Sequence, residues 1–201
     1  MPIFRGNVGN LMQHWVLCEL LAACKQHYDE IMFIDAHAMA PLATERPRRD
    51  QTAHWFDRVR DRLPGERTPY ENAWHTLASG GAAYPNSANF VTALWTGSYS
   101  LVLCESDQTT AHELEAWAGA VRGWPRCLGV EFAFGDWRER FRPGFASSAG
   151  LTFISFDPYM FNRHGASNPG QMGPADLAVA VMALAAVSGP ALIQALYLRC
   201  Q

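Results

Sequence analysis

Residues 152–161 read TFISFDPYMF, an apolar, β-branched and aromatic run that changes abruptly at Asp157, Pro158 and Tyr159. Such a run is typical of a strand buried on both faces of a parallel sheet. Pro158 has no backbone N–H to donate, so the strand has to end before it. A carboxylate and an aromatic ring then follow at the carboxyl edge of the sheet, where open α/β folds bind their ligands. A strand followed by an ordinary proline turn fits the same residues.

Apolar runs of strand length alternate with helical segments along the rest of the chain. We expect strands at residues 31–36, 101–104, 130–134, 151–156 and 191–198. We expect helices at about residues 11–26, 51–63, 70–79, 109–121 and 174–187, and a turn at 84–87 that caps a further helix through about 95. This alternation predicts an α/β fold, with a doubly wound, mainly parallel sheet and helices on both faces.

The domain organisation follows from the same pattern. Residues 1–201 are expected to form a single domain, with a helical insertion at about 41–83. That segment is too short and too polar to hold a hydrophobic core of its own.

The composition argues against several classes of protein. With 201 residues, of which 49% are hydrophobic, the chain can bury one sizeable core. The formal net charge of -3 provides no global basic field for nucleic acid. The five cysteines are odd in number and form no C-x-x-C pair, which argues against a disulfide framework and a zinc knuckle. The histidines lack the spacing of metal ligands, so we expect no metal.

The expected location is the cytoplasm, with no membrane partner. No charged segment followed by an apolar one opens the chain, so a secretory signal is not expected. The apolar stretch 175–198 is broken at Gly189 and Pro190 into pieces too short to span a bilayer.

Acidic residues follow four of the expected strands. They are Asp35, Glu105, Asp136 and Asp157. Each alone is unremarkable, because acids favour turns and helix caps. A carboxylate at the carboxyl edge of a sheet can accept hydrogen bonds from ribose hydroxyls or a base amine, so four of them favour a ligand of the nucleoside type.

Six short motifs occur in one order along residues 4–198. They are GNVGNLMQH at 6–14, FIDAHA at 33–38, YPNS at 84–87, LCE at 103–105, GDW at 135–137 and FDPY at 156–159. In this order they resemble the motifs of the J-type 23S ribosomal RNA adenine-N6 methyltransferases, a Rossmann-like family that uses S-adenosylmethionine. Each motif is weakly specific, and the six together are much more specific.

The resemblance implies an S-adenosylmethionine-dependent enzyme that methylates adenine N6 in RNA, with ribosomal RNA as the partner. It implies that the chain acts as a monomer or weak dimer. It implies cofactor-binding roles for His14, Asp35, Ser87, Glu105 and Asp136, and catalytic roles for Asp157, Pro158 and Tyr159. Alternatives remain for three of these residues: His14 also fits a core or capping histidine, Asp35 also fits a cap of the next turn, and Asp136 also fits the N-cap of a helix that starts at Trp137.

The chemistry expected of the FDPY motif can be stated without the family. An adenine amine is a poor nucleophile, because its lone pair is conjugated into the ring. The carboxylate of Asp157 and the carbonyl of Pro158 can accept its hydrogens and favour a nitrogen whose lone pair points outward. Tyr159 or Phe161 can stack on the base. In-line positioning next to an activated methyl group then provides much of the rate, and no strong base is needed.

The chain also departs from the family's motifs. Met39 and Pro41 stand where glycines are expected in the cofactor loop, and Pro41 cannot adopt positive φ. Gln13 replaces a lysine and Asn10 an acid, and the FDPY motif has a single proline. These departures favour the alternative that the chain keeps the fold but binds a nucleic acid or protein without catalysis. A nucleotide-binding enzyme of another chemistry on the same fold is a third hypothesis.

Overall fold

The computed structural model describes residues 8–43, 65–78, 84–140, 150–158, 160–161, 164–166 and 170–195. The chain divides into two compact units. The helical unit comprises Met1–Cys24 and Pro41–Trp95, and the sheet unit comprises Lys25–Ala40 and Thr96–Gln201. The segment at about 41–83 falls within the helical unit, and its description as an insertion in a single domain stays a prediction. The expected helix at about 51–63 lies outside the described residues.

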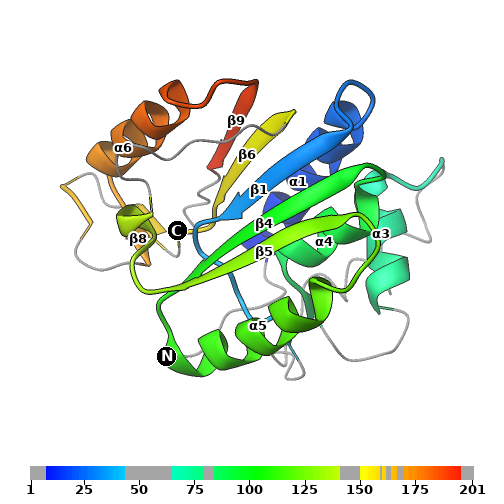
Figure 1. Cartoon of the computed structure of the whole chain (residues 1–201), viewed down its shortest axis with the longest axis horizontal. Helices are drawn as coiled ribbons and strands as arrows, with labels where there is room; N and C mark the ends of the chain where they lie inside the picture. Colours follow the sequence, from blue (N-terminus) through cyan, green and yellow to red (C-terminus); the bar gives the residue numbers. More distant parts are fainter. Residues whose placement is uncertain are drawn as a thin grey trace. The chain divides into compact units, whose positions relative to one another are not determined.

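The sheet unit contains a five-stranded sheet in the order β5-β4-β1-β6-β9 (Figure 1). The strands are β1 (Glu30–Asp35), β4 (Ser98–Glu105), β5 (Cys127–Phe134), β6 (Leu151–Phe156) and β9 (Ala191–Ala195). Every pairing in this sheet is parallel. The α/β class with a parallel, Rossmann-like sheet is therefore confirmed.

The strand order reverses between β1 and β6. From β1 the chain moves outward through β4 to β5, and it then returns to the other side of β1 to form β6 and β9. Parallel strands need right-handed crossovers, so the two directions place α5 (Gln108–Val121) and α6 (Pro174–Ala185) on opposite faces of the sheet (Figure 1). Such a reversal leaves a crevice at the carboxyl ends of the two central strands, which is where this architecture binds ligands.

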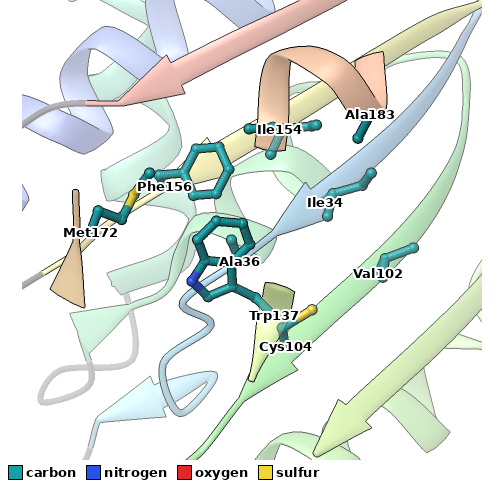
Figure 2. Packing of buried hydrophobic residues seen from close by; sticks show 10 residues of the cluster. Ile34, Ala36, Val102, Cys104, Trp137, Ile154, Phe156, Met172 and Ala183 are labelled. Atoms are coloured by element: carbon teal, nitrogen blue, oxygen red, sulfur yellow. The ribbon is translucent and has the colours of Figure 1, made fainter. Parts of the chain in front are cut away.

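One face of the sheet carries a hydrophobic core centred on Trp137. Strand side chains alternate between faces, so every second residue of β1, β4 and β6 points to this core. Its buried members are Ile34, Ala36, Val102, Cys104, Trp137, Ile154, Phe156, Met172, Ala180 and Ala183 (Figure 2). Trp137 is 1% exposed, and its ring lies 4.9 Å from that of Phe156. The strand residues that alternate with these core residues, such as Asp35 and Ser155, project from the opposite face of the sheet.

Trp137 belongs to the short 3-10 helix η3 (Trp137–Glu139), which directly follows β5. On the other side of the core, a short parallel pair of β7 (Met160–Phe161) and β8 (Gln171–Met172) precedes α6. Pro174 lies in the first turn of α6, as the sequence predicts, and the Asp176 carboxylate accepts the Gly173 N–H at 2.7 Å.

The helical unit consists of α1 (Val8–Cys24), α3 (Pro69–Ala78) and α4 (Ser87–Leu94), with a short antiparallel pair of β2 (Leu42–Ala43) and β3 (Tyr84–Pro85). The predicted cap at 84–87 is confirmed, since Asn86 Oδ1 accepts the Asn89 N–H at 3.0 Å. Aromatic rings fill the unit: that of Tyr70 lies 5.3 Å from Phe90 and 6.3 Å from Trp74.

Within the described ranges, no helix is long and apolar enough to cross a membrane. The same residues contain no group of three or more histidine, cysteine, aspartate or glutamate side chains that could hold a metal ion. The four described cysteines, Cys18, Cys24, Cys104 and Cys127, are free thiols.

Candidate functional site

Three of the four predicted strand-end acids lie at the carboxyl edge of the sheet, around the point where the strand order reverses. Asp35 ends β1, Glu105 ends β4, and Asp157 directly follows β6. Asp35 pairs in register with Leu103 on one side and Ser155 on the other, so the three strands end within two residues of one another. The sequence pattern predicted this gathering, since parallel strands all end at one edge.

The three acids influence one another electrostatically. Asp35 is buried, and its pKa is raised from 3.8 to about 8, first by loss of solvent and then by the negative charges of Asp157 and Glu105. The N–H of His37, 3.3 Å from Asp35 Oδ1, acts in the opposite direction. This contact also confirms that Asp35 caps the following turn, one of the two roles that the sequence left open.

Burial raises the pKa of Asp157 as well, to about 6. Burial raises both pKa values, and that of Asp35 further, so Asp35 keeps its proton to higher pH and can donate a hydrogen bond where Asp157 accepts one. Two neighbouring carboxyl groups with different pKa values are common in active sites, where one donates a hydrogen bond or proton and the other accepts one.

A buried hydroxyl adds to this edge. Ser155 is fully buried in β6, and its Oγ has no hydrogen-bond partner among the described residues. It lies in register beside Asp35, on the same face of the sheet. Sequence reasoning missed Ser155, because a serine inside an apolar run carries no signal of its own.

Glu105 is held by the turn that follows β4. Its Oε1 accepts the N–H groups of Ser106 at 2.6 Å and Asp107 at 2.7 Å. Asp107 in turn caps α5 by accepting the Thr110 N–H at 2.9 Å. The carboxylate of Glu105 is thus fixed in direction at the sheet edge, as binding a ligand hydroxyl requires.

The segment after β1 is tied to both neighbouring strands. The Ala36 N–H donates to Ser155 O at 3.0 Å, and the Ala38 N–H donates to Cys104 O at 2.8 Å. No residue from 36 to 40 has positive φ, and Ala38 is fully buried. This segment therefore lacks the glycine backbone that the resemblance associates with a cofactor loop, and two of its N–H groups are already used.

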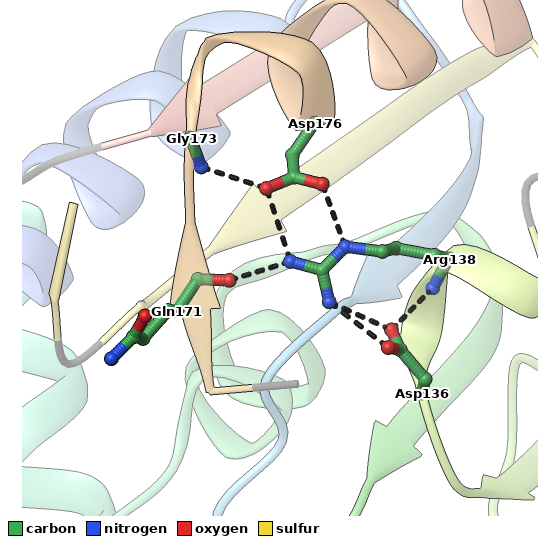
Figure 3. Close-up of polar contacts among 5 residues, drawn as sticks. All are labelled: Asp136, Arg138, Gln171, Gly173 and Asp176. Carbon is green, nitrogen blue, oxygen red and sulfur yellow. Dashed lines mark hydrogen bonds and ion pairs between the residues drawn. The ribbon is translucent and has the colours of Figure 1, made fainter. Parts of the chain in front are cut away.

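Asp136, the fourth acid, is engaged by an arginine. It caps η3 by accepting the Arg138 N–H, and both of its oxygens lie 3.0 Å from Arg138 Nη1 (Figure 3). The structure thus shows the helix cap, one of the two roles left open for Asp136. The same guanidinium also binds Asp176, with Nε 2.6 Å from Oδ1, and its Nη2 donates to Gln171 O at 2.7 Å.

This network affects the charges of its members. Hydrogen bonds from Arg138 lower the pKa of Asp176, and those to Asp176 and Asp136 raise the pKa of Arg138. Sequence reasoning missed Arg138 and Asp176, which lie 38 residues apart.

His14 and Ser87, two predicted cofactor residues, contact each other in the helical unit. His14 Nε2 lies 3.2 Å from Ser87 Oγ, and His14 Nδ1 lies 3.0 Å from the hydroxyl of Tyr84. His14 is fully buried, which lowers its pKa to about 3 and keeps the imidazole neutral. The structure thus joins the two motifs GNVGNLMQH and YPNS, and it adds Tyr84, to which the sequence assigned no role. This geometry matches the core histidine that the sequence left open.

Of the remaining predicted catalytic residues, Pro158 is buried directly after Asp157. Tyr159 lies outside the described residues, and so does the side chain of Phe161.

The geometry can now be compared with known proteins. No protein-family model matches the chain, and no curated protein matches it. Among solved structures, the chain is similar to the crystal structure of protein LPL1258 from Legionella pneumophila str. Philadelphia 1, described with the family model DUF519. The TM-score is 0.53 at 20% sequence identity, over 75% of this chain and 57% of that chain. The chain thus spans little more than half of its neighbour's length, and at this identity the likeness shows the fold alone.

Proposed function

We propose that the chain is an S-adenosylmethionine-dependent methyltransferase that modifies adenine N6 in RNA, with ribosomal RNA as the substrate class. The observation that carries the proposal is Asp157-Pro158 at the end of the buried strand β6, next to the reversal of strand order. Asp35 and Glu105 end the neighbouring strands, and the charge of Asp157 acts on Asp35. A cytoplasmic location and a monomer or weak dimer are part of the same proposal.

The chain's own residues support adenine as the target. An ionised Asp157 accepts one hydrogen of the amine, and the Pro158 carbonyl, which belongs to a residue without a backbone N–H, accepts the other. Both acceptors come from one rigid strand end, so the amine nitrogen is held in a fixed place. The cofactor would supply an activated methyl group at that nitrogen.

The residues fit the nucleoside half of this cofactor better than its amino-acid half. The oriented carboxylate of Glu105 suits ribose hydroxyls, and the protonated Asp35 and the Ser155 hydroxyl offer donors beside it. Against this, the segment 36–40 has its N–H groups at Ala36 and Ala38 bound to β6 and β4. The Asp136 carboxylate, which the resemblance assigns to the adenine of the cofactor, faces Arg138.

A methyl-transfer assay tests the proposal. Purified protein is incubated with RNA and S-adenosylmethionine labelled in the methyl group, and the RNA is digested to identify N6-methyladenosine. We expect the wild type to form this nucleoside and Asp157→Ala to lose about 100-fold or more in rate, because it loses an acceptor that acts on the reacting amine. Glu115→Ala, which removes an exposed acid from the middle of α5, is the matched control. Absence of product with every RNA offered, or full activity of Asp157→Ala, would contradict the proposal.

A second candidate is a binding protein that keeps this fold without catalysis. Two observations favour it: Asp136 is engaged by Arg138, and the segment after β1 is bound to β4 and β6. In that case the chain binds RNA or protein with the same affinity whether or not the cofactor is present. A filter-binding measurement with and without S-adenosylhomocysteine separates the two, since an enzyme of this kind couples the two ligands.

A further inference from the structure

The turn between α5 and β5 presents a tryptophan between two arginines. Residues 122–126 read RGWPR. Backbone hydrogen bonds order the turn: the Trp124 N–H donates to Val121 O at 2.9 Å, and the Cys127 N–H donates to Trp124 O at 3.2 Å. The backbone of the turn is therefore ordered, and this fixes the positions from which its side chains extend.

Trp124 is exposed and supported by a second ring. It is 41% exposed, although tryptophan is usually among the well-buried residues. The half-buried Trp117 of α5 packs against it, with ring centroids 6.1 Å apart and planes at 82°. This T-shaped pair restricts the Trp124 ring and leaves part of it accessible to a ligand.

Arg126 occupies a backbone conformation that favours glycine. Its φ is 73°, and no other described residue except glycines has positive φ. An L side chain is strained there, and strained residues concentrate at functional sites. A glycine would build the same turn with less strain, so the feature that only arginine adds is its exposed guanidinium.

Arg122 is held on the other side of Trp124. Its Nε and Nη2 both donate to Val130 O, at 3.1 and 3.0 Å. A guanidinium has five N–H donors, so this contact leaves donors for a ligand. Residues 122–128 contain two arginines and no acid, so this stretch of sequence carries a net positive charge.

We propose that Arg122, Trp124 and Arg126 form a binding surface for single-stranded nucleic acid, in which a base stacks on Trp124 and the arginines contact flanking phosphates. Aromatic rings beside cationic side chains are the usual means of holding single strands without reading their sequence. The turn precedes β5 and so lies at the amino edge of the sheet, whereas Asp35 and Asp157 lie at the carboxyl edge. The surface is therefore distinct from the candidate site, and it does not depend on methyl transfer.

Fluorescence anisotropy with labelled single-stranded oligo(U) and oligo(A) of roughly 12 nucleotides tests the proposal without cofactor. We expect Trp124→Ala to weaken binding about tenfold and Trp124→Phe to restore most of it, since both aromatic rings stack. We expect Arg126→Gly to weaken binding and to reduce the slope of log K against log salt by about 0.7, the value for one phosphate contact to a single strand. Arg126→Gly should relieve backbone strain, and a thermal melt that shows it at least as stable as the wild type excludes misfolding as the cause of its lower affinity.

Met182→Ala is the matched control, because Met182 is 73% exposed on α6, away from the turn and from the candidate site. It should bind as the wild type does. Wild-type affinity in both Trp124→Ala and Arg126→Gly would overturn the proposal, and so would an absence of wild-type binding at about 50 mM salt. A poly-glutamate peptide that competes equally well, with the same dependence on Trp124, would also overturn it in favour of an acidic protein partner. None of these results bears on the methyl-transfer assay, so the two proposals fail separately.

Discussion

Arg138 and Asp176 form a bidentate ion pair, with Nε 2.6 Å from Oδ1 and Nη2 3.0 Å from Oδ2. The pair joins η3, which carries the buried Trp137, to the first turn of α6. Both side chains are mostly buried, at 24% and 11% exposure, so the pair is less screened by solvent than a surface ion pair. The position of Trp137 in the core thus depends on a charged contact as well as on packing.

Asp176→Ala should destabilise the protein by roughly 2–4 kcal/mol, because the half-buried Arg138 loses one of its two carboxylate partners and α6 loses the cap at Gly173. Chemical denaturation followed by tryptophan fluorescence measures the change. Glu139→Ala removes an exposed acid from η3 and should change the free energy of unfolding by less than about 0.5 kcal/mol. Equal effects of the two substitutions would show that the ion pair contributes little.

The buried Asp35 should make stability depend on pH. Its pKa in the folded protein, about 8, lies above the unfolded value of 3.8, so the folded state binds the proton more tightly. The contribution of this group to the free energy of unfolding is therefore largest below about pH 4 and falls as pH rises to about 8. Asp35→Asn removes the cost of ionising a buried carboxyl group. It should therefore stabilise the protein above pH 8, by roughly 2–5 kcal/mol as an upper range.

Asp107 provides a control whose contribution should be the same at about pH 5 and pH 8.5, because both of its pKa values lie below this range. Hydrogen bonds from Thr110 lower its pKa, so its contribution is lost as pH falls below the unfolded value. Denaturation curves at about pH 5 and pH 8.5 should show Asp35→Asn gaining stability mainly at the higher pH. A gain of equal size at both would contradict the assignment.

The buried, neutral His14 should contribute to the stability of the fold at neutral pH, and this contribution should be lost in acid. Its folded pKa of about 3 lies below the unfolded value of 6.5, so the unfolded chain takes up a proton that the folded chain excludes. Stability should therefore decrease as pH falls from about 6.5 towards 3. His14→Phe should flatten this part of the profile, while Ser87→Ala should keep it and cost about 1–3 kcal/mol, because an imidazole nitrogen loses its partner. An unchanged pH profile in His14→Phe would show that another group titrates.

Arg126→Gly should stabilise the protein by roughly 1 kcal/mol, because glycine adopts positive φ without a steric penalty. The matched test is Gly135→Ala, at a φ of 123°, which should destabilise the protein by a similar amount or more. Thermal unfolding of the two variants checks both signs. A loss of stability in Arg126→Gly would mean that contacts of the arginine side chain outweigh its backbone strain.

Local patterns predicted much of the fold. The strand at 151–156 was predicted with its bounds, because both faces of β6 are buried and the run is continuous. β1 begins one residue earlier than predicted, at Glu30, and two other strands begin three residues earlier, at Ser98 and Cys127. Their first residues are polar or partly exposed, since β5 lies at the edge of the sheet and β4 opens with two serines, so no apolar run marks their start.

The site was predictable where it depends on position along the chain and not where it depends on pairing. Asp35, Glu105 and Asp157 follow strands, and parallel strands bring their ends to one edge whatever the remaining contacts are. The pairing of Arg138 with Asp176, 38 residues away, depends on how β5 and α6 fold onto one core. The contacts of His14 join residues 70 and 73 positions away, which no local pattern predicts.

The most direct test of the proposed function is calorimetric titration of the folded protein with S-adenosylhomocysteine. We predict saturable binding that Glu105→Ala weakens about tenfold or more, because a carboxylate that accepts ribose hydroxyls is lost. Asp157→Ala should bind the ligand nearly as well as the wild type, since its role lies with the substrate amine. An absence of binding heat with millimolar ligand, in protein shown to be folded, would contradict the proposal.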